Sequence, residues 1–156
     1  MQFTHSHYIG TGVNHDNEQF EGKLTISNLS STGTQSMHYI CQRISDGEKV
    51  HEELALLTTN ENGDKTLHLH MEELPSITIH TLATHDDALW TYSYTGTGQL
   101  EGFNSELVFE WNERKVKYLH RWAVNDEVSD KSWCLLEPVN VPDTDVSLSL
   151  TLSNNQ

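Results

Sequence analysis

The chain has 156 residues and a formal net charge of −14, from 9 Lys and Arg against 23 Asp and Glu. This length suits one domain, and the few basic residues are scattered, which excludes the clustered cationic surface that binds nucleic acid or anionic membranes. Only 35% of the residues are hydrophobic, yet four Trp, five Tyr and four Phe are too many for a disordered acidic chain.

Short segments of alternating polarity, separated by clusters of Gly, Asn, Asp and Pro, run along most of the chain. This period of two predicts β-strands, and almost no helical period is present. The ten predicted strands are residues 8–14, 20–29, 34–44, 49–59, 65–71, 76–84, 88–96, 105–111, 115–125 and 131–138.

The short loops between these strands decide the topology. Turns such as Asp46-Gly47 and Asn62-Gly63-Asp64 leave no room for crossover helices, so consecutive strands must be antiparallel neighbours. A meander of eight to ten strands with one apolar face favours closure into a barrel, because closure removes exposed strand edges. A two-sheet sandwich is the competing layout. We expect one all-β barrel domain over residues 1–141, followed by an edge strand or loose tail over 142–156.

The cysteines and the N-terminal residues indicate in which cellular compartment the protein is expected. Cys41 and Cys134 form no CxxC motif, so two free thiols are the simplest expectation. The N-terminal residues lack the basic and apolar regions of a secretory signal, which makes the cytoplasm the expected location. No apolar stretch approaches the ~18 residues of a membrane span. A homodimer through an edge strand or the tail is compatible with the sequence.

Strand alternation predicts which side chains enter the barrel. With a tight turn at Glu113-Arg114, Trp111 faces Val116 and Phe109 faces Tyr118. The same parity turns Glu110 and Lys117 outward as a complementary pair. Across the turn at 72–75, Leu67 and Leu69 should face Ile77 and Ile79, and the parity of strand 49–59 should place Glu52 inside. The residues expected to line the lumen and contact a ligand are Tyr39, Glu52, Trp90, Tyr92, Tyr94, Phe109, Trp111, Tyr118, His120 and Trp122.

This lining permits three functions. A small apolar or aromatic molecule could bind inside without reaction, oriented by the few polar groups. Alternatively, a small barrel enzyme of isomerase or hydrolase type could use His120 and Glu52 as acid and base. In the third case side chains fill the lumen and the domain acts through its surface, since a barrel of about eight strands is the size at which either outcome occurs.

The chain has ten histidines, which raises the question of a metal site. His68 and His70 share one strand face, and the pairing of Leu69 with Ile79 would add His80 to it. Three imidazoles could hold Zn²⁺. However, this face points outward, where no shaped cavity exists, so we expect exposed histidines and no metal.

The layout resembles the calycin-type barrels, which include lipocalins, fatty-acid-binding proteins and small bacterial lipocalin-like proteins. The resemblance extends over most of residues 7–140 and rests on four segments. They are the glycine-bearing strand 8–12, the run Phe20-Glu21-Gly22-Lys23-Leu24, the acidic hairpin 46–53 and the closing run Tyr118-Leu119-His120-Arg121-Trp122.

The resemblance implies a binding protein for a small hydrophobic ligand, held inside the barrel. The chain lacks the GxWxGxG stretch of the haem-binding nitrobindin-like barrels, so we do not expect His120 to ligate haem and we expect no cofactor. No catalytic or binding residue of a known family can be transferred to a position of this chain.

Overall fold

Ten β-strands account for most of residues 3–140, which are the residues described by the computed structural model. Their bounds are β1 His7–Val13, β2 Gln19–Asn28, β3 Gln35–Arg43, β4 Lys49–Thr59, β5 Lys65–Met71, β6 Thr78–His85, β7 Leu89–Thr95, β8 Phe103–Asn112, β9 Lys115–Val124 and β10 Ser129–Pro138. A short 3-10 helix, η1 (Gly98–Leu100), precedes β8. The predicted boundaries agree with these to within two residues, and the expected segment 142–156 lies outside the described residues.

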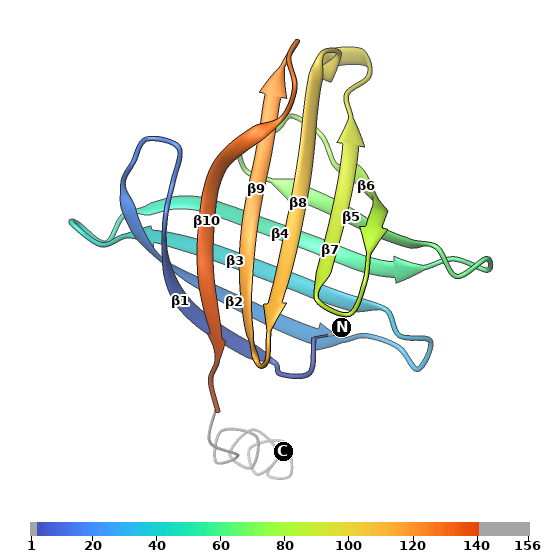
Figure 1. Ribbon diagram of the computed structural model, residues 1–156, viewed down its shortest axis with the longest axis horizontal. Helices are drawn as coiled ribbons and strands as arrows, with labels where there is room; N and C mark the ends of the chain where they lie inside the picture. Colours follow the sequence, from blue (N-terminus) through green and yellow to red (C-terminus); the bar gives the residue numbers. More distant parts are fainter. Residues whose placement is uncertain (1–2, 141–156) are drawn as a thin grey trace, which may run out of the picture.

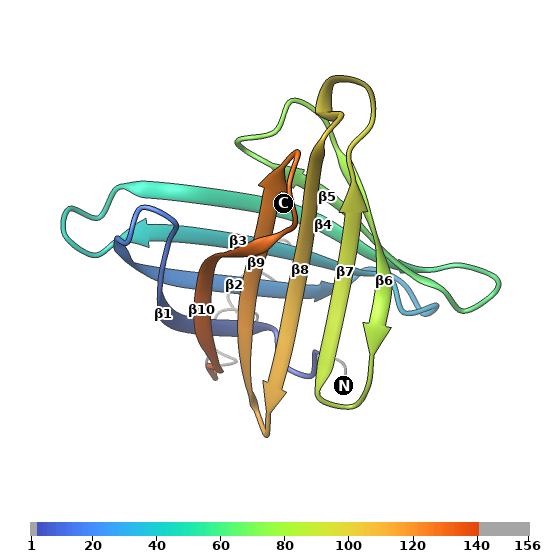
Figure 2. The same ribbon diagram turned by 45° about the horizontal axis from the view of Figure 1, so that its top comes forward.

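The strands form an antiparallel meander that closes on itself. Each strand pairs with its neighbours in the sequence, and β1 also pairs with β10, which completes the barrel. In Figures 1 and 2, β2, β3 and β4 cross behind β8 and β9, so the sheet wraps around one interior. The predicted all-β barrel is confirmed. Among residues 3–140, no helix is long and apolar enough to cross a membrane.

Two glycines in β1 allow the barrel to close. A Cβ atom on Gly10 would lie 1.8 Å from the carbonyl oxygen of Leu135, and one on Gly12 would lie 1.8 Å from that of Trp133. Both obstacles are backbone atoms of β10, which cannot rotate away. Glycine at these positions therefore lets β1 approach β10 closely where the two ends of the meander meet.

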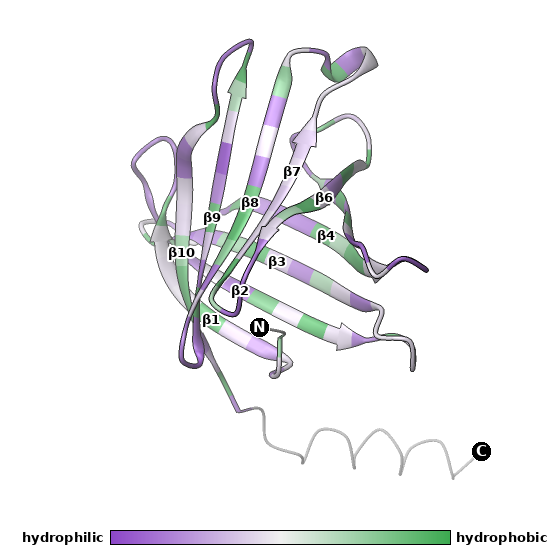
Figure 3. Cartoon of the chain, turned by 45° about the vertical axis from the view of Figure 1, so that its right-hand side comes forward, coloured by the Kyte–Doolittle hydropathy of each residue, from purple (hydrophilic) through white to green (hydrophobic). Residues whose placement is uncertain are grey.

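The β8–β9 hairpin has the predicted register. Trp111 pairs with Val116, Phe109 with Tyr118, and Glu110 with Lys117. The prediction succeeded because two independent signals agreed: one parity gathered the apolar residues, and the other brought opposite charges together. Hydropathy coloured along the chain gives alternating bands on several strands, as this period of two requires (Figure 3).

The predicted inner face of β4 was wrong. Glu53, Ala55 and Leu57 point inward, whereas Leu54 and Leu56 are exposed. Glu52 lies on the outer side and interacts with Lys49 and His38. The run Leu54-Ala55-Leu56-Leu57 contains apolar residues at both parities, so alternation alone could not choose between the two faces.

The predicted pairing of β5 with β6 was wrong by one residue. Leu69 pairs with Thr78 and Leu67 with His80, so Thr78 and His80 are inside and Ile77 and Ile79 are exposed. A slip of one residue turns every side chain of a strand to the other face. The prediction placed Ile77 and Ile79 in the core, but the buried residues of β6 are the polar Thr78 and His80.

The two ends of the barrel differ. At the end where the chain begins, the ring of Phe3 packs edge-on against Tyr8, Phe109 and Trp111, with ring centroids 4.9–5.9 Å apart. Trp90 and Tyr92 are also buried. This half of the interior is filled. The opposite end, bounded by the β1–β2, β3–β4 and β5–β6 connections, holds an open cavity.

Candidate ligand-binding site

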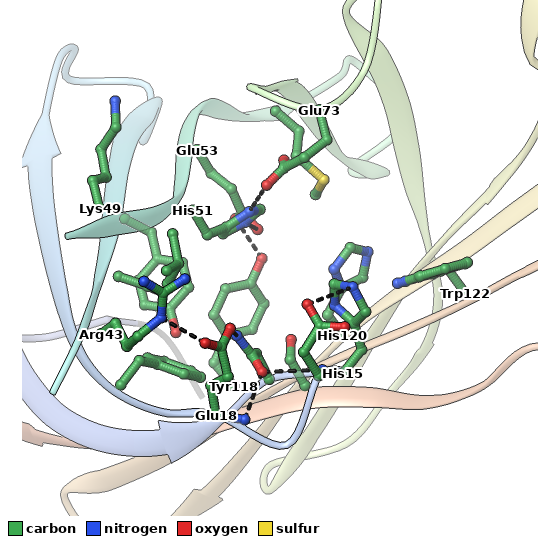
Figure 4. A pocket seen from close by; sticks show the side chains of 18 of the residues that line it. His15, Glu18, Arg43, Lys49, His51, Glu53, Glu73, Tyr118, His120 and Trp122 are labelled. Carbon is green, nitrogen blue, oxygen red and sulfur yellow. Dashed lines mark hydrogen bonds and ion pairs between the residues drawn. The ribbon is translucent and has the colours of Figure 1, made fainter. Parts of the chain in front are cut away.

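An open cavity of about 430 Å³ occupies this end of the barrel. Aromatic and aliphatic side chains form much of its wall, and charged side chains gather at its mouth (Figure 4). The lining residues are Asn14, His15, Asp16, Glu18, Phe20, Tyr39, Cys41, Arg43, Lys49, Val50, His51, Glu53, Met71, Glu73, Leu74, Phe103, Tyr118, His120, Trp122 and Ser132.

Four of the ten residues predicted to bind a ligand line this cavity: Tyr39, Tyr118, His120 and Trp122. Five others lie elsewhere in the barrel. Four of them are buried but do not line the cavity: Trp90, Tyr92, Phe109 and Trp111. The fifth, Tyr94, packs beside His80, with their ring centroids 5.3 Å apart. Glu52 is on the outer side of β4. The acid and base of the enzyme alternative, His120 and Glu52, therefore do not meet inside the barrel.

The glutamate that lines the cavity is Glu53, which follows Glu52 in the sequence and is only 3% exposed. Its Oε1 lies 2.6 Å from Nε2 of His51, and its Oε2 accepts a hydrogen bond of 2.6 Å from the hydroxyl of Tyr118. The other ring nitrogen of His51, Nδ1, lies 2.7 Å from Oε1 of Glu73. Figure 4 shows these four side chains converging from β4, β9 and the β5–β6 connection.

Charge and burial compete within this network. Burial by itself would lower the pKa of His51, but the hydrogen bonds and charges of Glu53 and Glu73 outweigh it and raise the pKa to about 10. Burial would raise the pKa of Glu53, but its hydrogen bond and ion pair with His51 lower it overall. The network thus consists of a protonated imidazole between two carboxylates.

A bulge in β4 brings Val50 into the cavity beside His51. Cys41 of β3 pairs with His51, but the next residue, Gln42, pairs with Lys49, so Val50 has no partner. As a result Val50 and His51, although adjacent in sequence, both line the cavity. Bulges re-aim side chains in this way, and strict alternation could not have predicted that Val50 faces the cavity.

A second hydrogen-bond network, separate from that of Glu53, runs from the cavity into the barrel. Nε2 of His120 lies 3.2 Å from Oγ of Ser105, which in turn lies 3.2 Å from Nε2 of His80. Nδ1 of His80 lies 3.4 Å from the hydroxyl of Thr78. Ser105, His80 and Thr78 are almost fully buried, whereas His120 is half-buried and reaches the cavity.

His120 and His80, the two histidines of this hydrogen-bond series, are neutral at physiological pH. Burial lowers the pKa of His120 to about 4, and burial together with the charge of His120 lowers the pKa of His80 to about 4. Two of the three histidines that line the cavity therefore differ in charge: His51 is protonated and paired, and His120 is uncharged.

The thiols are not activated as nucleophiles. Cys41 and Cys134 are free and buried, and burial raises the pKa of Cys134 to about 11 and that of Cys41 further. Both lie near Tyr39, whose ring fits over Gly22: a Cβ there would lie 2.7 Å from Sγ of Cys134 and 3.0 Å from Cε2 of Tyr39.

The cations at the mouth are engaged by acidic neighbours. Nε of Arg43 lies 2.6 Å from Glu18 in an ion pair, and its Nη1 donates a hydrogen bond of 2.7 Å to Asp46. Lys49 contacts Glu52 and lies 3.5 Å from Glu72. Sequence reasoning did not place Arg43 and Lys49 at a cavity mouth, because they lie at strand ends, where loop lengths decide which residues meet.

The three histidines considered for a surface metal site do not share a face. His68 and His70 lie on the outer side of β5, but His80 points into the barrel, contrary to the prediction. The one-residue slip between β5 and β6 is the cause. Within residues 3–140, no group of three or more His, Cys, Asp or Glu side chains has a geometry that could hold a metal ion.

The fold has a counterpart among solved structures. The crystal structure of Rv2717c from M. tuberculosis superimposes with a TM-score of 0.64 at 12% sequence identity, over 86% of this chain and 92% of that chain. At this identity the similarity concerns the fold alone. No protein family model matches this sequence, and no curated protein matches it.

Proposed function

We propose that the barrel binds one small, largely apolar or aromatic molecule in the cavity without transforming it. The observation that carries this proposal is the cavity itself, which stays open while the other half of the interior is filled. Its volume of about 430 Å³ falls within the roughly 300–1,000 Å³ of typical ligand pockets. Phe20, Tyr39, Phe103 and Trp122 offer aromatic surface, and the buried polar groups are held by hydrogen bonds within the protein.

The polar groups favour binding over catalysis. A nucleophile needs an activated group, but the pKa values of both thiols are raised by burial. The Glu53 carboxylate is held by His51 and Tyr118, so neither of its oxygens is left without a partner. The acid and base of the enzyme alternative, His120 and Glu52, lie on different sides of the barrel wall.

Blocking the cavity tests the proposal. Nile red, a neutral dye that fluoresces in apolar surroundings, should bind saturably with one molecule per chain. Leu74→Trp introduces a larger ring at a residue that lines the cavity, and we expect it to weaken dye binding by about tenfold or more.

The matched control is Leu54→Trp, which makes the same change on the outer face, where Leu54 is 53% exposed. It should bind Nile red as the unmodified chain does. Absence of saturable binding, or equal losses in the two variants, would contradict a ligand site in the cavity.

A further inference from the structure

The charged groups of the cavity already have partners within the protein. Both carboxylate oxygens of Glu53 are engaged, one by His51 and one by Tyr118, and the second nitrogen of His51 is engaged by Glu73. A charged ligand group placed beside this network would lose its hydration without gaining a free counter-ion. Such desolvation without pairing is costly.

The mouth of the cavity gives no advantage to an anion either. Its two cations, Arg43 and Lys49, are each held by at least two acidic side chains. The lining includes four acidic residues, Asp16, Glu18, Glu53 and Glu73, against these two cations and the protonated His51. A ligand carboxylate would therefore meet a net negative surface and would have to compete with existing ion pairs.

The neutral polar groups that line the cavity include His120, whose Nδ1 is available to a ligand. His120 contacts Ser105 through Nε2, and no other described residue within 3–140 hydrogen-bonds its Nδ1. Ser105 has a single hydroxyl proton shared between two imidazoles, His120 and His80, at 3.2 Å each. It donates to one ring and accepts from the other. Nδ1 of His120 is consequently an acceptor in one arrangement and a donor in the other.

We propose that the ligand is uncharged and carries a hydroxyl, carbonyl or amide group that hydrogen-bonds to Nδ1 of His120. This inference rests on the proposed function, because it specifies the ligand of the same cavity. The apolar part of the ligand would lie against the aromatic wall. Because the Ser105 hydroxyl can donate either to His120 or to His80, the polar group of the ligand can be either a donor or an acceptor.

Four naphthalene compounds that differ in one group test the inference by calorimetry at neutral pH: naphthylethanol, ethylnaphthalene, naphthylethylamine and naphthylacetate. We expect the alcohol to bind about five- to tenfold more tightly than ethylnaphthalene, from one hydrogen bond to a neutral partner. The anionic acetate should bind at least about tenfold more weakly than the alcohol, and the cationic amine, whose charge would be desolvated without a free counter-ion in the buried network, should also bind more weakly.

Variants then locate the hydrogen bond. His120→Leu should reduce the affinity ratio of naphthylethanol to ethylnaphthalene to about one, and His120→Gln, whose amide can donate and accept, should restore a ratio above one. His68→Leu, the same change on the outer side of β5, is the control and should keep the full ratio.

The outcomes separate the two proposals. If none of the four compounds binds, the proposed function and this inference both fail. If the compounds bind but either charged analogue equals the alcohol, or the ratio survives His120→Leu, the cavity is a ligand site and only the inference is overturned. The comparison among the four compounds on the unmodified chain is decisive even if His120→Leu does not fold.

Discussion

At the residue scale, two adjacent glutamates have opposite surroundings, and only Glu53 lines the cavity. Glu52 faces outward beside Lys49 and His38, whereas Glu53 is buried and holds His51 and Tyr118. Exposed ion pairs contribute little to stability because water screens them. Removing one member of a buried pair leaves an uncompensated charge, which costs far more.

This contrast gives a stability prediction. Glu53→Gln should lower the free energy of unfolding at pH 7 by about 3 kcal/mol, because His51 loses its buried counter-charge. Glu52→Gln, the identical change one residue earlier, should have a much smaller effect. Urea denaturation of both variants measures the difference, and equal losses would contradict the inward placement of Glu53.

The histidines predict how stability depends on pH. His51 has a pKa raised to about 10 by Glu53 and Glu73 against the opposing effect of burial. The folded state therefore holds a proton that the unfolded state releases above about 6.5. Its contribution is fully present below pH 6.5 and is lost as the pH rises through 10. His51→Gln should flatten this alkaline decline, and a decline that persists unchanged would contradict it.

His120 affects the pH dependence of stability in the opposite direction from His51. Burial lowers its pKa to about 4, so below about pH 6.5 the unfolded state takes up a proton that the folded state does not. Stability should fall as the pH drops from 6.5 to 4. His120→Gln should reduce that acid decline while leaving the alkaline one in place, as measured by unfolding at a series of pH values.

At the element scale, strands and loops differ in how well their sequence determines them. The meander, its ten strands and the β8–β9 register follow from the sequence, because apolar alternation and charge pairs such as Glu110 with Lys117 agree. Alternation failed on β4, where Leu54 and Leu57 make both faces apolar, and on β6, where buried His80 replaces an expected isoleucine.

The same limits explain the candidate site. Tyr39, Tyr118, His120 and Trp122 were predictable, since their strands have one clear apolar face. His51 and Glu53 lie on the face of β4 that alternation did not select, and Val50 depends on the β3–β4 bulge. Arg43 and Glu73 depend on where strands and loops end. Bulges and loop lengths change the facing of a residue without leaving a periodic signal in the sequence.

Closure of the barrel gives a test at this scale. Gly12→Ala would place a Cβ atom 1.8 Å from the backbone oxygen of Trp133, so we expect it to cost about 3 kcal/mol or more of stability. Thr11→Ala, at an exposed neighbouring position of β1, should stay within about 0.5 kcal/mol. Thermal unfolding of the pair measures this, and a stable Gly12→Ala variant would contradict the close approach of β1 to β10.

At the scale of the whole molecule, the two ends of the barrel differ: one is filled by side chains and the other holds an open cavity. The Phe3 cluster closes one end with aromatic packing, and the cavity lies at the other with its charges paired. Under the proposed function, stability and ligand recognition would lie in different parts of one interior.

Phe3→Ala should separate the two roles. Loss of a buried aromatic ring costs about 3 kcal/mol, so the variant should unfold at a lower denaturant concentration. Its affinity for Nile red should remain that of the unmodified chain under conditions in which it is folded. A loss of dye binding without a loss of stability would contradict the separation of the two ends.

The central claim is that a ligand enters this cavity, and the four tryptophans report on it directly. Trp122 lines the cavity, Trp90 and Trp111 lie in the filled half, and Trp133 is on the outer surface. Titration of ¹⁵N-labelled protein with naphthylethanol, followed through the four indole N–H resonances, should shift the Trp122 signal saturably and the other three far less. A saturable shift confined to Trp133, or no shift at all, would contradict the account.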